Sequence, residues 1–328
     1  MKRLVDADRL ARPRTVRQAR GAAGRPGRPA GEVPDGRPLL DAARRGDAIA
    51  ARARLAELVD AADLPAQLAH HLALVETGLA EAAEDTDATT ACDGWRRAWR
   101  HWFRWLAGDD PQAGSVRPLL LAHLLDRHRH RLNDHLARGE TTAAGGLWSL
   151  VGSLPTGAAG TPFAAEVVDR VAGFHDELAT EYLLTTREAM RLGAIPEGWR
   201  ADYPRGLAML DRLLALDADN GRLLTAFVET CNDWALDLYH CQRWTELQAL
   251  VDRAAPAADR LRRLIDGRTG ELLARNALSE LCKVRGFVEP NAGRKAEHYR
   301  EALRLNPANR NARELLDELE SPGDDDAG

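Results

Sequence analysis

The sequence predicts an all-α protein. Its 328 residues are 45 % hydrophobic, but only 5 % are aromatic and only three are isoleucine, while Ala, Leu, Arg and Glu carry most of the chain. Ala and Leu favour helices, whereas the β-branched and aromatic residues that fill pleated sheets are scarce. Apolar residues also recur every three to four positions, as on one face of a helix. The length exceeds that of one ordinary core, which indicates two domains or one elongated repeat array.

Residues 1–36 are basic, in contrast to the rest of the chain. They carry nine Lys or Arg against four Asp or Glu, a local charge of +5, which leaves −10 for the remainder of the formal −5. The stretch Gly21–Gly36 is rich in Gly and Pro and has no apolar period, which is typical of a linker. We expect a disordered basic arm, suited to contact nucleic acid, anionic lipid or the acidic body itself.

Three helices are predicted between residues 38 and 82. Gly46 closes the first, and Asp47 is placed to cap the second. Asp63 caps the third, where Pro65 at the first position costs no hydrogen bond. The third helix has one apolar stripe, formed by Leu64, Leu68, Leu72, Val75, Leu79 and Ala82.

The most aromatic segment, Cys92–Pro111, predicts a helix that is buried through its tryptophans. One face contains Trp95, Trp99, Trp102 and Leu106, and the other faces contain Arg96, Arg97, Arg100 and Arg104. Trp105 and Phe103 are expected to point away from the apolar face, and Trp with Arg on a helix surface is typical of a binding hot spot. Trp105 and Arg104 are therefore candidate partner-binding residues, with stacking on single-stranded nucleic acid as a third interpretation.

Two further helices precede an internal break. A long helix is predicted from Pro118 to Gly139, in which His128 fills one turn of the leucine stripe at the edge of the core. A shorter helix follows around Leu147–Leu154. The Gly- and Pro-rich stretch Gly152–Pro162 is the best internal boundary of the chain.

A long helix is expected after this boundary, with Thr161 as its cap. Its stripe contains Val167, Val171, Phe174 and Leu178. The breaks together predict a disordered basic arm (1–36), an N-terminal helical region with the Trp-rich helix (37–155), a helical repeat region (161–320) and an acidic tail (321–328).

From about Tyr203 onward, long and short helical patterns alternate. Helices are expected over Arg222–Tyr239 and over Trp244–Leu264, the second interrupted by Pro256. Near the C-terminus an aromatic residue is followed by Ala three positions later and then by Leu-x-Leu-x-Pro. The residues concerned are Tyr299, Ala302, Leu303, Leu305 and Pro307. This half-motif resembles the second helix of a tetratricopeptide repeat, and a looser copy begins at Gly206.

The resemblance implies antiparallel helical hairpins stacked as an α-solenoid with a concave surface. Tetratricopeptide proteins generally use that surface to hold a peptide or part of a partner protein. By resemblance, side chains from the first helix of each pair would line it: Asn232, Trp234, Asn276, Lys283 and Arg285.

Three residue constellations raise the question of an enzyme. The first is His123, His130 and Asp134, which share the polar side of one helix. The second is His175, Glu177 and Glu181, and the third is Cys231, His240, Cys241 and Cys282, of which Cys231 and Cys241 are expected to face inward. Solvated or packed side chains explain each of them, and the chain has no GxSxG, Walker, GxGxxG or HExxH motif. We expect no catalysis and no cofactor.

The leading hypothesis is a cytoplasmic scaffold or adaptor that binds a partner protein or peptide. No apolar run reaches membrane length, and Asp6 and Asp8 interrupt any signal-peptide pattern, so neither a membrane nor an export signal is expected. One alternative is a nucleic-acid-associated regulator that uses the Arg-rich arm, which an acidic body disfavours. Another is a metal-dependent helical enzyme.

Overall fold

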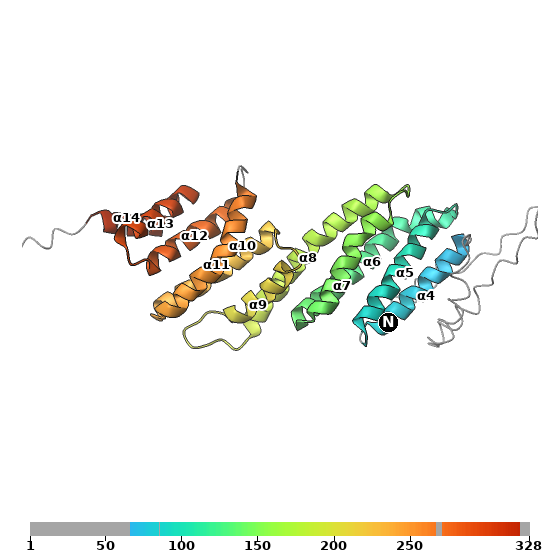
Figure 1. Ribbon diagram of the computed structural model, residues 1–328, viewed down its shortest axis with the longest axis horizontal. Helices are drawn as coiled ribbons and strands as arrows, with labels where there is room; N and C mark the ends of the chain where they lie inside the picture. Colours follow the sequence, from blue (N-terminus) through green and yellow to red (C-terminus); the bar gives the residue numbers. More distant parts are fainter. Residues whose placement is uncertain (1–65, 85, 267–270, 322–328) are drawn as a thin grey trace, which may run out of the picture. The chain divides into compact units, whose positions relative to one another are not determined.

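The computed structural model describes residues 66–84, 86–266 and 271–321. Over these ranges the chain forms eleven α-helices and no strand, which confirms the all-α prediction (Figure 1). The first five helices are α4 (Ala66–Ala83), α5 (Ala88–Leu106), α6 (Pro111–Arg138), α7 (Thr141–Gly157) and α8 (Ala164–Leu192). The other six are α9 (Tyr203–Leu214), α10 (Gly221–His240), α11 (Trp244–Ile265), α12 (Leu272–Val288), α13 (Ala292–Leu305) and α14 (Arg310–Glu320).

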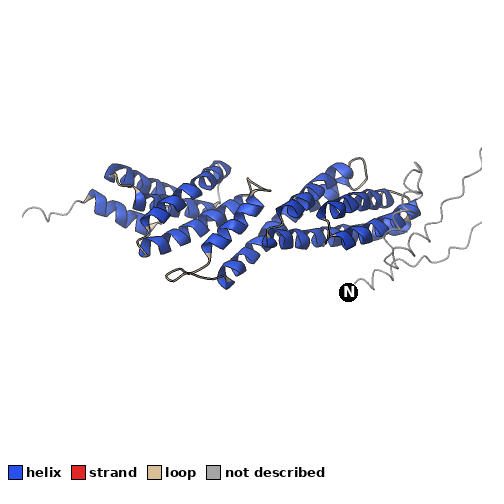
Figure 2. Ribbon diagram, turned by 60° about the horizontal axis from the view of Figure 1, so that its bottom comes forward, coloured by secondary structure: helices blue, strands red, loops and turns tan. Residues whose placement is uncertain are grey.

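Several predictions fall outside the described residues. They are the basic arm 1–36, the two helices expected between residues 38 and 60, the cap at Asp63, the proline at position 65 and the acidic tail beyond residue 321. In the remainder of the chain, helices and short loops account for the whole secondary structure that Figure 2 displays.

Helix α6 begins earlier than predicted because of its cap. Asp110 Oδ1 accepts a hydrogen bond from the amide of Gln112 at 2.9 Å, and Pro111 occupies the first turn, where no backbone donor is needed. The helix therefore starts at Pro111, and Pro118, which the sequence indicated as its start, lies inside it. Pro118 is exposed, so the ring costs one hydrogen bond without disturbing the packed face.

Two other prolines also lie inside helices. Helix α7 continues through Pro155 to Gly157, and α11 is continuous through Pro256 where an interruption was expected. Buried apolar residues on both sides of each proline hold the helix against its neighbours. Thr161 does not cap α8: its hydroxyl donates to the carbonyl of Ala158 at 2.7 Å, and the helix begins after Phe163 with no side-chain cap.

The helices pack in chain order. Each contacts its successor, and among the even-numbered helices α6 contacts α8, α8 contacts α10, and α10 contacts α12. Contacts between α6 and α8 occur in the same order along both helices: Arg117 with Glu166, Arg129 with Glu177, and Asn133 with Thr185. These two helices are therefore parallel. The same order relates α10 to α12, where Asn232 contacts Ala277 and Tyr239 contacts Phe287.

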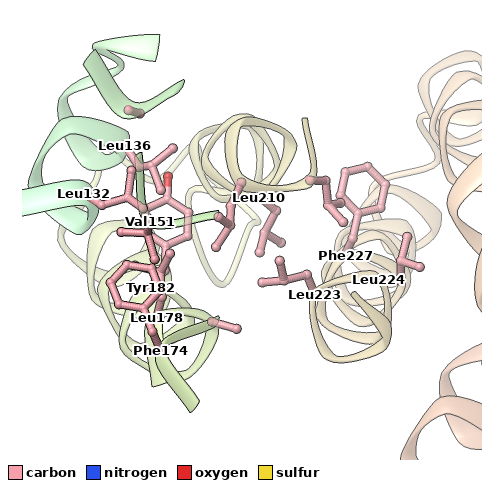
Figure 3. Packing of buried hydrophobic residues seen from close by; sticks show 14 of the residues in the cluster. Leu132, Leu136, Val151, Phe174, Leu178, Tyr182, Leu210, Leu223, Leu224 and Phe227 are labelled. Carbon is pink, nitrogen blue, oxygen red and sulfur yellow. The ribbon is translucent and has the colours of Figure 1, made fainter. Parts of the chain in front are cut away.

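One connected hydrophobic core runs from α4 to α14. Figure 3 shows the part in which α6, α7, α8, α9 and α10 meet, with Leu132, Leu136, Val151, Phe174, Leu178, Tyr182, Leu210, Leu223, Leu224 and Phe227. The buried hydroxyl of Tyr182 also donates to the carbonyl of Met209 at 3.1 Å and so links α8 to α9. The core includes residues on both sides of the stretch 152–162, and the domain boundary predicted there stays a prediction.

Candidate functional site

Two of the predicted partner-binding residues on α10 and α12 are buried, and a third is half-buried. Asn232 is buried, and its Nδ2 donates to the carbonyl oxygen of Ala277 at 2.9 Å. Lys283 is only 3 % exposed, and its ammonium group pairs with Glu280 one turn away. Asn276 is half-buried on α12. Asn232 and Lys283 are thus committed to contacts within the chain.

The other two residues predicted on these helices point elsewhere. Trp234 is half-buried in an aromatic cluster, with its ring centroid 5.1 Å from that of Trp199 and 6.3 Å from that of Tyr203. Arg285 lies on the side of α12 near His298, whose pKa is lowered first by burial and then by the charge of Arg285. Since Lys283 and Arg285 are about 200° apart around the helix, the five residues do not form one surface.

The prediction that Trp105 and Phe103 point away from the core was wrong. Both are buried, because α5 packs between α4 on one side and α7 on the other. His70 of α4 stacks on the Trp105 ring with centroids 4.3 Å apart, and Phe103 packs against Phe163. Trp95, Trp99 and Trp102 are buried as predicted, while Arg104 is exposed.

A groove of about 550 Å³ lies between the parallel helices α6 and α8. It is lined by Ala122, His123, Leu125, Asp126, Arg129, Arg170, Gly173, Phe174 and Glu177, and we call it the α6–α8 groove. Leu125 and Phe174 are buried at its floor. Gly173 keeps the floor open, because a Cβ atom added there meets no other atom within 4 Å. The groove thus combines an apolar floor with charged walls.

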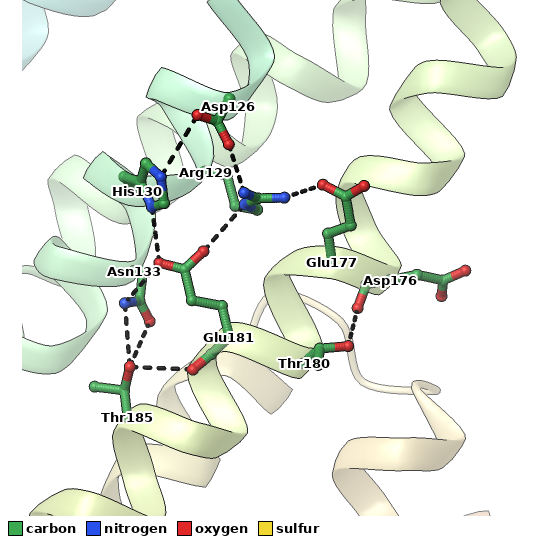
Figure 4. A network of polar contacts seen from close by, with 9 residues as sticks. All are labelled: Asp126, Arg129, His130, Asn133, Asp176, Glu177, Thr180, Glu181 and Thr185. Atoms are coloured by element: carbon green, nitrogen blue, oxygen red, sulfur yellow. Dashed lines mark hydrogen bonds and ion pairs between the residues drawn. The ribbon is translucent and has the colours of Figure 1, made fainter. Parts of the chain in front are cut away.

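Arg129 organises one end of the groove. Its guanidinium group forms ion pairs with Asp126 of α6 and with Glu177 and Glu181 of α8, the last at 3.0 Å between Nε and Oε2 (Figure 4). Glu181 also lies 2.9 Å from Nδ1 of His130 and accepts from Nδ2 of Asn133 at 3.2 Å. One arginine here faces three carboxylates, of which those of Asp126 and Glu177 line the groove, so this end has an excess of negative charge.

The opposite end of the groove has the opposite balance. Arg170 of α8 lines this end, and it shares Glu166, which does not itself line the groove, with Arg117 of α6; the Nε–carboxylate distances are 3.1 Å and 2.9 Å. All three side chains are about 70 % buried, with 27–30 % of each exposed. Two arginines share one carboxylate, so this end carries an excess of positive charge.

The structure rearranges the first two constellations considered for a metal. His130, Glu177 and Glu181, which the sequence assigned to separate groups, meet at the negative end of the groove. His123, His130 and Asp134 all line a neighbouring hollow of about 320 Å³ beside α6. Within the described ranges, no group of three or more His, Cys, Asp or Glu side chains is arranged to hold a metal ion.

The remaining candidates are dispersed. His175 does not line the groove. It packs on Trp148 with ring centroids 4.4 Å apart, and burial lowers the pKa of His175. Cys231 and Cys241 do not both face inward, since Cys241 follows the last turn of α10 and is exposed. Burial raises the pKa of Cys231 to about 12, so this thiol is protonated at neutral pH.

Sequence reasoning missed Arg129, Arg170 and Gly173, which give the groove its charge and its opening. The charged run Asp126–Arg131 was visible, and its spacing places several members on one side of a helix. The partner of that run is α8, about fifty residues away, and no local pattern indicates which helices become neighbours.

Comparison with protein-family models, with curated proteins and with solved structures finds no match to this chain. Among the helices that the structure describes, none is both long enough and apolar enough to cross a membrane. The groove geometry is therefore the basis for inferring function.

Proposed function

We propose that this protein is a non-catalytic scaffold that binds a segment of a partner protein in the α6–α8 groove. The observation that carries the proposal is the groove itself, about 550 Å³ with Leu125, Phe174 and the open Gly173 at its floor. Pockets of this size with an apolar lining and a few polar groups are typical binding sites, and apolar anchors in such pockets supply most of the affinity of an interface.

The packing of the helices supports a scaffold. Parallel even-numbered helices that contact one another in series are expected of stacked antiparallel hairpins, in which the first helices share one surface. We propose on this basis that the array is an α-solenoid similar to tetratricopeptide proteins, with α6 and α8 as two of its first helices. Such a surface presents side chains from several helices to one extended ligand.

The chemistry around the groove supports binding over catalysis. Its arginines are held in ion pairs with carboxylates of the same two helices. Of the four cysteines, three are buried, and burial raises the pKa of each of those three thiols. An activated nucleophile requires the opposite shift and a base beside it. The groove offers recognition by shape and charge.

The test is capture of a partner by a protein whose groove has been filled. Gly173→Trp places an indole over the floor without a backbone clash, and Gly152→Trp on α7 is its matched control, because a Cβ there also meets open space. We expect the tagged wild-type protein and Gly152→Trp to retain the same partner from native lysate at high salt, and Gly173→Trp to lose it. Circular dichroism and the unfolding midpoint verify that all three proteins are folded.

The same experiment separates the scaffold from the nucleic-acid alternative. Deletion of residues 1–36 should leave the captured partner unchanged, because the groove lies wholly within α6 and α8. Recovery of nucleic acid alone, lost with nuclease, with salt or with the arm, would instead support the regulator hypothesis, because phosphate contacts release counterions. Equal capture by Gly173→Trp and Gly152→Trp would remove the groove from the proposal.

A further inference from the structure

We infer that the α6–α8 groove selects a short extended peptide segment that carries an acidic residue at one end, an apolar residue in the middle and a basic residue at the other end. This inference rests on the proposed function and names the chemistry of the ligand. It is carried by the opposite charge balance at the two ends of one groove with an apolar floor between them.

The negative end calls for a cationic side chain. Asp126, Glu177 and Glu181 share the single charge of Arg129, and the side chain of Glu177 is 64 % exposed. The neighbouring His130 contacts Asp126 and Glu181. A Lys or Arg of the ligand would balance the excess, and complementary charge also fixes the register of binding.

The positive end calls for a carboxylate. Arg117 and Arg170 divide one carboxylate, that of Glu166, each through Nε. An arginine presents five donors in a planar fork that matches a carboxylate, so two arginines on one glutamate retain donor capacity for a second. An Asp or Glu of the ligand is the group that fits this end.

The distance between the ends sets the spacing of the ligand residues. Arg170 and Glu177 are separated by two turns of α8, about 10.5 Å at the rise of an α-helix. An extended chain advances about 3.3 Å per residue, so the two charged residues of the ligand lie about three or four positions apart. A residue between them faces the floor, where Gly173 leaves room for an apolar side chain.

An extended segment spans the length of the groove, about 10.5 Å between Arg170 and Glu177, with three or four residues. A strand-like segment places alternate side chains toward the floor and toward solvent. Only part of the segment needs to enter the groove.

The test is selection of phage-displayed random nonapeptides on the full chain and on groove variants. We expect enriched peptides to carry one acidic and one basic residue three or four positions apart with an apolar residue between them. Their affinity, measured with fluorescent copies by polarisation, should fall by about tenfold on Gly173→Trp, as expected for loss of a buried anchor. Gly152→Trp should leave it unchanged.

Charge reversal distinguishes recognition of this charge pattern from non-specific binding. Arg170→Glu should favour peptides with two basic residues, and Glu177→Lys should favour peptides with two acidic residues. Each reversal should change the preference by about fivefold, as expected for exposed ion pairs. Arg260→Glu, a reversal on the exposed side of α11, is the control and should alter no preference.

The outcomes separate this inference from the scaffold proposal. Peptides that depend on an open groove but lack the mixed-charge pattern, or reversals that leave the selection unchanged, would overturn the inference and keep the groove as a binding site. Absence of enrichment, or equal binding to Gly173→Trp, would also overturn the inference. Capture of a native partner by Gly152→Trp and its loss on Gly173→Trp would then still support the scaffold.

Discussion

Acidification from about pH 6.5 to about pH 4 is expected to lower the free energy of unfolding steeply, and His128 is the main cause. The ring is fully buried between helices, and its Nε2 accepts a hydrogen bond from Nε1 of Trp99 at 3.0 Å. Burial, and secondarily the charge of Arg127, lower the pKa of His128 from 6.5 to about 3. The folded protein therefore holds this histidine neutral.

The sign of the effect follows from proton linkage. The folded pKa is below the unfolded pKa, so between the two values the unfolded chain binds more protons than the folded chain. Stability is then fully present above about pH 6.5 and decreases as the pH falls toward 3, by about 1.4 kcal/mol per pH unit at most for one histidine. Burial also lowers the pKa of His70 and of His101 to about 4, and both add to the loss.

The measurement is urea unfolding at several pH values for the wild type and His128→Gln. The amide oxygen of Gln can accept the indole hydrogen bond, but it does not titrate. The variant should lose less stability on acidification, by about 1.4 kcal/mol per pH unit between pH 4 and 6. Glu229 and Asp233, whose pKa is raised by burial, act in the opposite direction in both proteins and cancel in the comparison. Identical pH slopes would show that His128 is not held neutral by burial.

Trp95→Ala should destabilise the protein by about 3–5 kcal/mol, the range for a buried Trp truncated to Ala. Trp95 has no exposed surface, its ring stands edge-on to His128 with centroids 4.5 Å apart, and its Nε1 donates to Glu84 at 2.9 Å. The variant opens a cavity and also leaves part of the Glu84 carboxylate without its donor. Both effects act at the contact between α4, α5 and α6.

The control for this variant is Trp244→Ala, at a tryptophan that is 48 % exposed at the start of α11. Its truncation should cost less than about 1 kcal/mol, because little apolar surface leaves a packed environment. The midpoints of urea unfolding, compared at unchanged dependence of the free energy on urea concentration, measure the loss of stability of both variants. Similar losses at the two positions would mean that the Trp-rich helix is not the packed element that its burial indicates.

The helical faces were predictable from the sequence where one apolar stripe decides burial. Trp95, Trp99 and Trp102 were expected on one buried face, and they are buried. Trp105 and Phe103 were misplaced because a single helix pattern does not reveal that α5 is covered on two sides. The end of α7 and the continuity of α11 were missed for a related reason, since buried apolar residues on both sides of a proline outweigh the hydrogen bond that the proline removes.

The candidate groove depended on contacts between distant segments. His130 and Glu181 are 51 residues apart in the sequence, and only the parallel packing of α6 on α8 brings them within 2.9 Å. The tetratricopeptide resemblance stays a prediction; its residues Tyr299 and Ala302 are buried where α13 packs on α12 and α14. The apolar periodicity of the sequence predicts the buried face of each helix. Charged residues that face each other across two helices can be predicted only once it is known which helices are neighbours.

Site-specific photo-crosslinking tests the central claim most directly. A photoreactive amino acid replaces Ala122, an exposed residue in the groove wall, and in a matched protein it replaces the exposed Gly152 on α7. We predict that the partner captured at high salt is crosslinked from position 122 and not from position 152, through a segment that mass spectrometry can sequence. Crosslinking from position 152 alone, or equally from both positions, would contradict a partner seated in the α6–α8 groove.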